Sequence, residues 1–209
     1  MIGGFAQMKM KRLLVILSLV LFSCHAELPP APPAAEKAHE LVKAARSQIG
    51  VTTSYDPAYV GLDYPGGDLP LAKGVCTDVV IRALRKSGFD LQKLVHEDMK
   101  KNFSSYPKIW GLSRTDRNID HRRVPNLRTY FDRRGISQTL STDKGDFLAG
   151  DLVTCTVPGN RPHIMIVSDR RTKDGTPLVI HNIGSGTKEE NSLFKFPING
   201  LYRWFKVEK

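Results

Sequence analysis

The sequence predicts an α+β domain, because helical patterns fill its first part and short strand patterns fill its last third. Residues 36–49 carry apolar side chains at helical spacing, and the pattern ends at Gly50. Between residues 151 and 207, four segments rich in β-branched or aromatic residues are separated by turn residues such as Pro158-Gly159-Asn160. This order predicts N-terminal helices packed on a C-terminal antiparallel meander.

Three more helices and four strands complete this prediction. The expected helices are 78–87, 90–103 and 124–135, and the expected strands are 151–157, 163–168, 177–181 and 201–207. Residues 51–74, before the second helix, hold four glycines, three prolines, three aspartates and three tyrosines. A loop of this length in a compact domain is usually either functional or disordered.

The N-terminal residues 1–23 predict a secretory signal peptide. Basic residues precede an apolar run over 13–22, which is shorter than the roughly 20 residues needed to cross a membrane. The run ends in Leu21-Phe22-Ser23-Cys24, which resembles a bacterial lipobox. We therefore expect an exported, periplasmic protein that is anchored to the outer membrane by a lipid on Cys24.

The mature chain is expected to begin with a spacer, residues 24–35, because its prolines favour an extended conformation. Residues 36–209 have the length of one domain. The net charge is +10, and removing the three positive charges of residues 1–23 leaves +7. This charge suits an anionic envelope polymer, and export argues against nucleic acid. We expect a monomer without a cofactor.

Two cysteines, Cys76 and Cys155, lie in different predicted settings. Cys76 follows the long loop at the first turn of a helix, where free N–H groups and the helix dipole favour a thiolate. Cys155 lies within a strand among threonines and valines. Cys76 is therefore the candidate nucleophile, while a Cys76–Cys155 disulfide or a packed core thiol are the alternatives.

A thiol nucleophile needs a base, and two histidines occupy suitable positions. His163 begins one apolar strand and His181 ends another, so neighbouring strands can bring them to one edge of the sheet. We expect His163 to be the base and His181 to orient it, with Asn182 as the competing third residue. Zinc bound by Cys76, His163 and His181 is the alternative, but no zinc-site spacing is present and no metal is expected. The other histidines lie in the spacer, on charged helices or, for His121, in a polar loop.

Several segments resemble known families. Three segments resemble sequence blocks of NlpC-type cell-wall peptidases. The Cys block is matched by Gly74–Arg82 around Cys76, the Gly-Asp-Leu-Val block by Gly150–Val153, and the His block by His163–Asp169. The chain is more closely similar to the YijF-like bacterial family (domain of unknown function 1287) over about residues 40–206. The segments that carry this similarity are Tyr64–Asp68, Gly74–Asp78, Asp116–Arg123 and Pro162–Val167. Thr77-Asp78 follows Cys76 where the NlpC-type block has Ser-Gly, so the resemblance does not fix the substrate.

The resemblance implies a papain-like fold over residues 36–209 and a cysteine peptidase or amidase that acts on peptidoglycan or its muropeptides. The bond would be cut by an endopeptidase, a carboxypeptidase or an N-acetylmuramoyl-L-alanine amidase. Cys76 matches the nucleophile, His163 the base and His181 the third polar residue. We expect Tyr64, Asp78 and Asn182 near the substrate, and Arg122 and Arg123 either to bind a stem-peptide carboxylate or to brace their loop. A non-catalytic envelope-binding module and a thiol acyltransferase remain alternatives.

Overall fold

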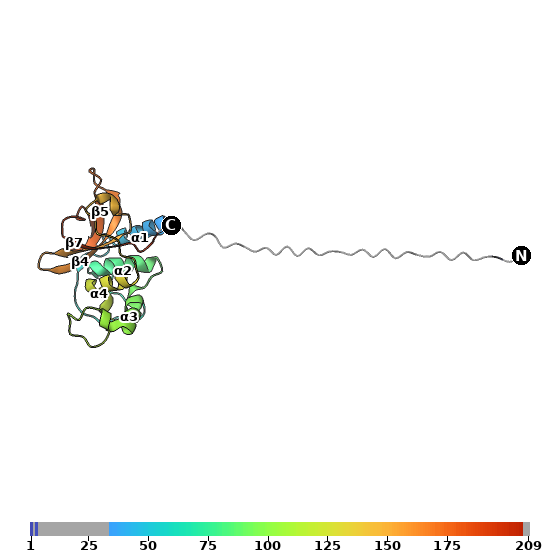
Figure 1. Ribbon diagram of the computed structural model, residues 1–209, viewed down its shortest axis with the longest axis horizontal. Coiled ribbons are helices and arrows are strands. Elements are labelled where there is room, and N and C mark those ends of the chain that lie inside the picture. The colour runs from blue at the N-terminus through green and yellow to red at the C-terminus, as the bar shows by residue number, and fades with distance from the viewer. Residues whose placement is uncertain (2, 4–33, 207–209) are drawn as a thin grey trace. The chain divides into compact units, whose positions relative to one another are not determined.

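The computed structural model describes residues 1, 3 and 34–206, so the predicted signal peptide, Cys24 and most of the spacer lie outside the described residues (Figure 1). The helices of the described part are α1 (Ala34–Arg46), α2 (Cys76–Lys86), α3 (Leu91–Asn102) and α4 (Val124–Arg133). The strands are β1 (Ser54–Tyr55), β2 (Lys73–Gly74), β3 (Leu152–Val157), β4 (Arg161–Arg171), β5 (Pro177–Asn182), β6 (Thr187–Glu190) and β7 (Ile198–Tyr202). None of the helices described is long and apolar enough to cross a membrane.

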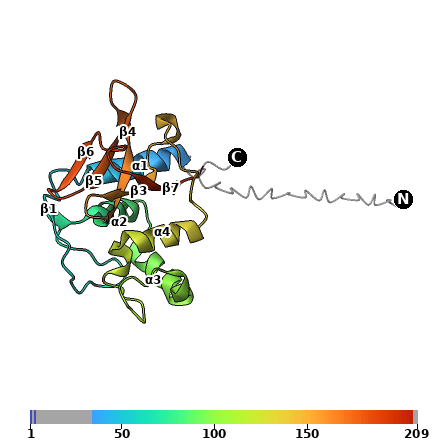
Figure 2. The ribbon, with the colours of Figure 1, turned by 60° about the vertical axis from the view of Figure 1, so that its left-hand side comes forward.

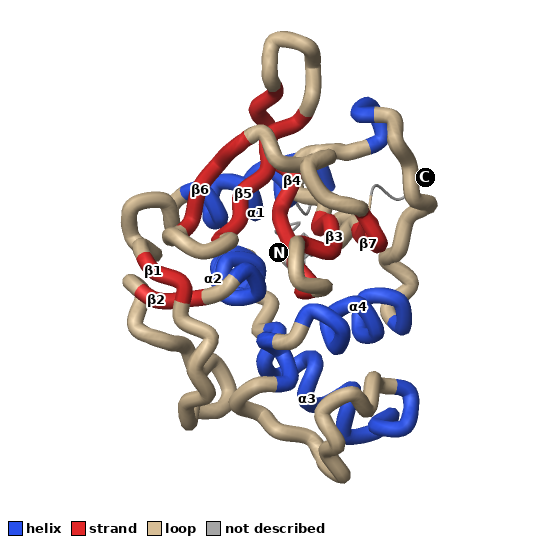
Figure 3. Tube along the Cα trace, turned by 90° about the vertical axis from the view of Figure 1, so that its left-hand side faces the viewer, coloured by secondary structure: helices blue, strands red, loops and turns tan. Residues whose placement is uncertain are grey.

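The last third of the chain forms one antiparallel sheet in the order β6-β5-β4-β3-β7 (Figure 3). Strands β3, β4 and β5 pair in chain order as in the predicted meander, and β6 adds to β5. The last predicted segment, in β7, instead returns to pair with β3 at the opposite edge. Strands β1 and β2 form a separate parallel pair inside the long loop. The α+β prediction is therefore confirmed.

Two strand predictions differ from the structure. Strand β6 was not predicted, because its sequence Thr-Lys-Glu-Glu lacks an apolar alternation. It joins the sheet by backbone pairing with β5 and by the side chains of Glu189 and Glu190. The predicted strand 201–207 is wrong beyond Tyr202. There the chain leaves the sheet, because Arg203 pairs with Asp151 and Trp204 packs against the helix-side core.

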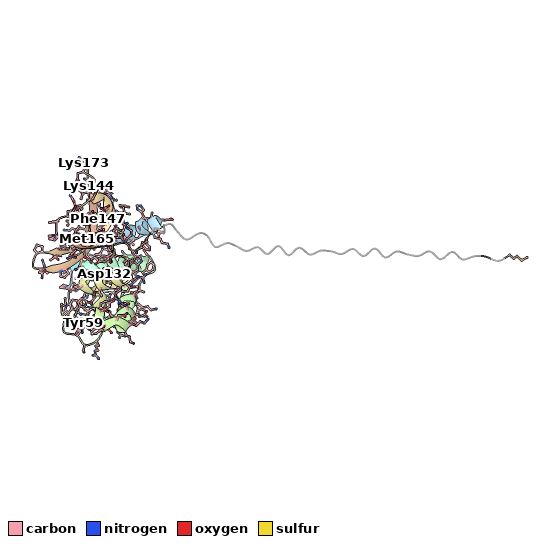
Figure 4. The ribbon with its side chains drawn as sticks, viewed as in Figure 1. Tyr59, Asp132, Lys144, Phe147, Met165 and Lys173 are labelled. Carbon is pink, nitrogen blue, oxygen red and sulfur yellow. The ribbon has the colours of Figure 1, made fainter. Side chains whose placement is uncertain are left out.

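The sheet separates two hydrophobic clusters. Helices α1, α2 and α4 contact one face of it, and α3 packs on α2 and α4 in a layer farther from the strands (Figure 2). Ile164 and Ile166 of β4 join the cluster on the helix side. Met165 and Val167, which alternate with them, join Phe147 in the second cluster, and Figure 4 shows Met165 and Phe147 close together. Alternate residues of β4 thus serve different cores.

Gly150 lets the chain enter β3 directly beside α1. Its φ is +83°, in the left-handed region that favours glycine. A Cβ at this position would also come within 3.0 Å of the Cβ and the carbonyl oxygen of Ala38. The Gly-Asp-Leu-Val segment therefore has a packing function at the junction of α1 and the sheet.

Candidate active site

Cys76 is the first residue of α2, and the turn that carries it is fixed by its own side chains. The extended residue Val75 caps the helix, and its N–H donates to Oδ2 of Asp78 at 2.7 Å. This bond satisfies an N–H group that the start of the helix would otherwise leave free. Asp78, expected near the substrate, therefore holds the backbone that presents Cys76.

Arg122 holds the same carboxylate from the other side. Its Nε and Nη2 each lie 3.0 Å from an oxygen of Asp78, and both side chains are buried. The guanidinium also donates to the carbonyl oxygens of Asp56 and Ala58 at 3.2 Å. Of the two functions expected for Arg122, the structure contains the bracing one: this residue ties the long loop to α2.

The thiol of Cys76 is neutral at rest. The residue is 4% exposed, and burial raises the pKa of its thiol to about 12. Backbone N–H groups of Ile164 and Thr77 act on the sulfur in the opposite direction and lower this pKa, but burial dominates. Burial therefore opposes the thiolate that the helix N-terminus favours. Cys76 and Cys155 are both free, so the disulfide alternative is not present.

The structure brings His163 and His181 into direct contact. Nε2 of His163 lies 2.8 Å from Nδ1 of His181, and the two buried rings meet edge to face with centroids 5.0 Å apart. Burial, and then the neighbouring His181, lower the pKa of His163 to about 3. Nε2 of His181 in turn lies 3.1 Å from Oε1 of Glu190 on β6. The predicted pair is thus the inner part of a chain across β4, β5 and β6.

Cys76 meets β4 one residue away from His163. The backbone N–H that acts on its sulfur belongs to Ile164, the residue that follows His163. Among the described residues, no hydrogen bond joins the sulfur to an imidazole nitrogen, and Nδ1 of His163 has no hydrogen-bond partner. Catalytic hydrogen bonds of enzymes without substrate are often long, so a base can lie beyond hydrogen-bond distance of its nucleophile in this state.

A pocket of ≈280 Å³ opens beside Cys76. The loop before α2, the segment 109–125 and the start of β4 supply its walls. It is lined by Tyr55, Pro57, Val75, Cys76, Ile109, Trp110, Ile119, Arg122, Arg123, Val124, Pro125 and Pro162. The nucleophile candidate therefore lies in a mostly apolar cleft with arginines in its wall, as is usual for a small-ligand site.

Arg123 differs from its neighbour Arg122 in making no side-chain hydrogen bond among the described residues. It stacks on the ring of Trp110 at 4.1 Å, and its Nη1 forms an ion pair with Oδ1 of Asp120 at 3.6 Å. Its Nη1 is buried and has no hydrogen-bond partner among the described residues. A planar cation held this way can receive a carboxylate in the pocket.

Two other expected substrate contacts lie elsewhere. Tyr64 packs edge to face on His96, at 5.2 Å between ring centroids, and does not line the pocket. Asn182 is fully buried and donates to the carbonyl oxygens of Ser54 and Gly74 at 3.2 and 3.0 Å. It therefore supports the backbone before Cys76, and the contact to His163 is made by His181.

Several pocket residues were missed by sequence reasoning. Tyr55 belongs to the long loop, where the concentration of tyrosines was a usable signal, and burial raises the pKa of its phenol. Trp110 and Pro162 carried no pattern that distinguished them from other loop residues. Glu190 belongs to the strand that was not predicted. His121, expected in a polar loop, is buried, and burial lowers its pKa to about 3.

No three His, Cys, Asp or Glu side chains gather as a metal site within residues 34–206, where the structure describes the domain. The two imidazoles and the Glu190 carboxylate are hydrogen-bonded in series across β4, β5 and β6. A tetrahedral site instead needs its ligands around one point.

Comparison with known proteins relates this site to a family and, more distantly, to a fold. The profile of the family "Domain of unknown function (DUF1287)" matches residues 42–204. The uncharacterized protein YijF of Escherichia coli (strain K12) is 52% identical over 203 residues, which cover 94% of this chain and 99% of that protein.

Two solved structures from Trichomonas vaginalis are similar in fold. NlpC1 has a TM-score of 0.44 at 13% identity, over 84% of this chain and 46% of that chain. NlpC2 has a TM-score of 0.41 at 15% identity, over 81% and 48%. The chain spans about half the length of these two structures.

Proposed function

The chain belongs to the DUF1287 family, and from the site described above we propose that it is a cysteine amidohydrolase that cleaves an amide bond in peptidoglycan. The observation that carries the proposal is the position of Cys76. Cys76 lines a pocket at a helix N-terminus, and the backbone N–H that acts on its sulfur belongs to Ile164, the residue after His163. Nε2 of His163 is in turn bonded to Nδ1 of His181. Nucleophile, base and orienting residue are the parts that acyl transfer needs.

The first half of the reaction forms a thioester. Because thiol and imidazole are both neutral at rest, Nδ1 of His163 takes the proton of Cys76 as the sulfur attacks the amide carbonyl. The N–H group of Cys76 at the start of α2 stabilises the oxyanion. The carbon–nitrogen bond then breaks, and the departing amine receives the proton from His163.

The second half returns the enzyme to its resting state. His163 takes a proton from water, the resulting hydroxide attacks the thioester, and the carbon–sulfur bond breaks. The proton returns to Cys76, and a carboxylic acid leaves the pocket. Hydrolysis therefore consumes one water and releases one acid and one amine. An acyltransferase would instead pass the acyl group to a second amine.

The pocket supports a substrate with a carboxylate near the scissile amide. Arg123 offers an N–H group that makes no hydrogen bond among the described residues, while Tyr55, Ile109 and Trp110 supply apolar and aromatic walls. Stem peptides of peptidoglycan combine small side chains with free carboxylates, which suits this lining. The protein would meet this polymer in the periplasm if Cys24 carries the expected lipid.

The test is digestion of purified muropeptides by the full-length protein, followed by mass spectrometry. We expect two free fragments whose masses together exceed that of the substrate by one water, and the bond cut identifies the enzyme as endopeptidase, carboxypeptidase or amidase. We expect the Cys76→Ala variant to release none, with Cys155→Ala as the matched control that retains activity.

Other outcomes would overturn the proposal. A product in which the acyl group is joined to a second amine, with no water added to the summed masses, would identify an acyltransferase. Equal fragment release by wild type and Cys76→Ala would exclude Cys76 as the nucleophile. Binding of muropeptides without cleavage by the wild-type protein would identify an envelope-binding module.

A further inference from the structure

Glu190 is the outermost member of the hydrogen-bonded chain that begins at His163. This series of hydrogen bonds crosses three neighbouring strands, with His163 on β4, His181 on β5 and Glu190 on β6. The two contacts are 2.8 Å between the imidazoles and 3.1 Å from His181 to the carboxylate. Ser192 donates to the same carboxylate oxygen at 2.9 Å. Glu190 is therefore held in place at the end of the chain.

The carboxylate determines which nitrogen of each imidazole carries the proton. An ionised carboxylate can only accept hydrogen bonds, so Nε2 of His181 must be the donor. A neutral imidazole has one N–H and one lone pair, so Nδ1 of His181 must accept. Nε2 of His163 then donates to it, and the lone pair of His163 is left on Nδ1.

We propose that Glu190 is a positioning residue that fixes the tautomers of both histidines and thereby presents Nδ1 of His163 as the base. This inference rests on the proposed function and extends it by one residue. When Nδ1 takes the thiol proton, His163 becomes an imidazolium that still donates from Nε2. The negative charge of Glu190, two hydrogen bonds away, then stabilises that cation.

Other charged groups around the pair oppose this effect. Lys188 lies directly opposite His181 in the β5–β6 pairing, and Lys188 and Lys195 both lower the pKa of His181. Burial lowers it further, while Glu190 raises it. The thiol of Cys155 lies opposite His163 in the β3–β4 pairing. Glu190 is the carboxylate among these groups. Without it, the lysines and burial lower the pKa of His181 with no negative charge to oppose them.

The decisive variant is Glu190→Gln in the full chain. Its amide keeps the size of the side chain but can donate to Nε2 of His181, which reverses both tautomers and leaves a proton on Nδ1 of His163. We expect kcat on muropeptides to fall by roughly 10- to 100-fold with little change in KM. Because Glu190 raises the pKa of His181, the acid limb of kcat/KM should move to lower pH in the variant.

The tautomers are read directly by nitrogen-15 NMR of histidine-labelled protein. We expect the wild type to be protonated on Nε2 at both histidines, and Glu190→Gln to shift protonation toward Nδ1. Glu189→Gln is the control. Glu189 lies on the same strand as Glu190, but it bonds Arg46 of α1 and Ser168 of β4, so its loss should leave both tautomers and kcat unchanged.

Protonation of His163 on Nδ1 in the wild-type protein would overturn the proposal, as would unchanged tautomers and kcat in Glu190→Gln. A wild-type protein that hydrolyses no muropeptide would instead refute the proposed function. The NMR measurement still decides the role of Glu190 in that case, so the two failures are distinguishable. If Glu190→Gln does not fold, Ser192→Ala gives a second test, because the loss of its hydrogen bond loosens the same carboxylate.

Discussion

Cys76 and Cys155 are both free and buried, yet their surroundings have different chemical consequences. Burial raises the pKa of both thiols, to about 12 for Cys76 and about 11 for Cys155. Cys76 lines a pocket and has N–H groups of Thr77 and Ile164 at its sulfur. Cys155 is fully enclosed in the second cluster, and burial alone accounts for its shift. Access and hydrogen-bond donors, more than acidity, distinguish a candidate nucleophile from a core thiol.

The two cysteines also approach His163 in different ways. Cys155 lies directly opposite His163 in the ladder, while Cys76 approaches through the backbone of Ile164. Proximity to His163 therefore does not by itself select one cysteine. What selects Cys76 is that a substrate in the pocket can reach its sulfur, whereas the core encloses that of Cys155.

The largest expected effect separates His163 from another buried histidine. We predict that His163→Gln lowers kcat on muropeptides by about 10²- to 10⁴-fold, the range expected for loss of a general base. His121→Gln is the matched control, because burial lowers the pKa of His121 to about 3 as well, but His121 has no hydrogen bond to His163, His181 or Glu190. We expect its kcat to stay close to the wild-type value, because the hydrogen bonds that hold His163 are left intact. Equal losses in both variants would mean that His163 only supports the fold.

The helices, the meander and the identity of the two histidines could be predicted because each is encoded locally. Apolar spacing marked α2, and β-branched runs marked β4 and β5, so the expectation that His163 and His181 meet followed from strand ends alone. The pairing of Arg122 with Asp78 could not be predicted, so the sequence left the two functions expected for Arg122 open. Their pairing joins segments 44 positions apart, and no local pattern records such a contact.

The raised pKa of the Cys76 thiol could not be predicted from the sequence either. Its place at a helix N-terminus predicted a thiolate, but how far Ile164, Val80 and their neighbours enclose it is a property of the assembled core. The position of Glu190 beside His181 could not be predicted for a related reason. Strand β6 has a polar sequence, and only pairing with β5 brings its carboxylate to His181.

An intermediate effect concerns thiol reactivity. We predict that iodoacetamide labels Cys76 about tenfold or more faster than Cys155 in the folded protein, because reactivity follows access as well as thiolate fraction. With a pKa near 12, the thiolate fraction of Cys76 rises about tenfold per pH unit across pH 6–9, and the labelling rate should rise with it.

Peptide mapping by mass spectrometry resolves the labelled cysteines, with the Cys76→Ala and Cys155→Ala proteins as controls. A rate for Cys76 that levels off near neutral pH would contradict the neutral resting thiol and indicate a preformed thiolate–imidazolium pair. Faster labelling of Cys155 would reverse the contrast between the two cysteines.

The smallest expected effect is on stability. Cys155→Ser buries a hydroxyl among Val153, Met165 and other apolar side chains, and we predict a loss of about 1–3 kcal/mol in the free energy of unfolding. Cys76→Ser places its hydroxyl at the N–H groups of Ile164 and Thr77, so we predict a loss below about 1 kcal/mol. Urea unfolding monitored by circular dichroism measures both values, and Cys155→Ala separates the cost of the hydroxyl from that of the lost sulfur. If Cys76→Ser proved the more destabilising of the two, the polar donors at Cys76 would not be reaching its side chain, and the feature that distinguishes the two thiols would have to be access to the pocket alone.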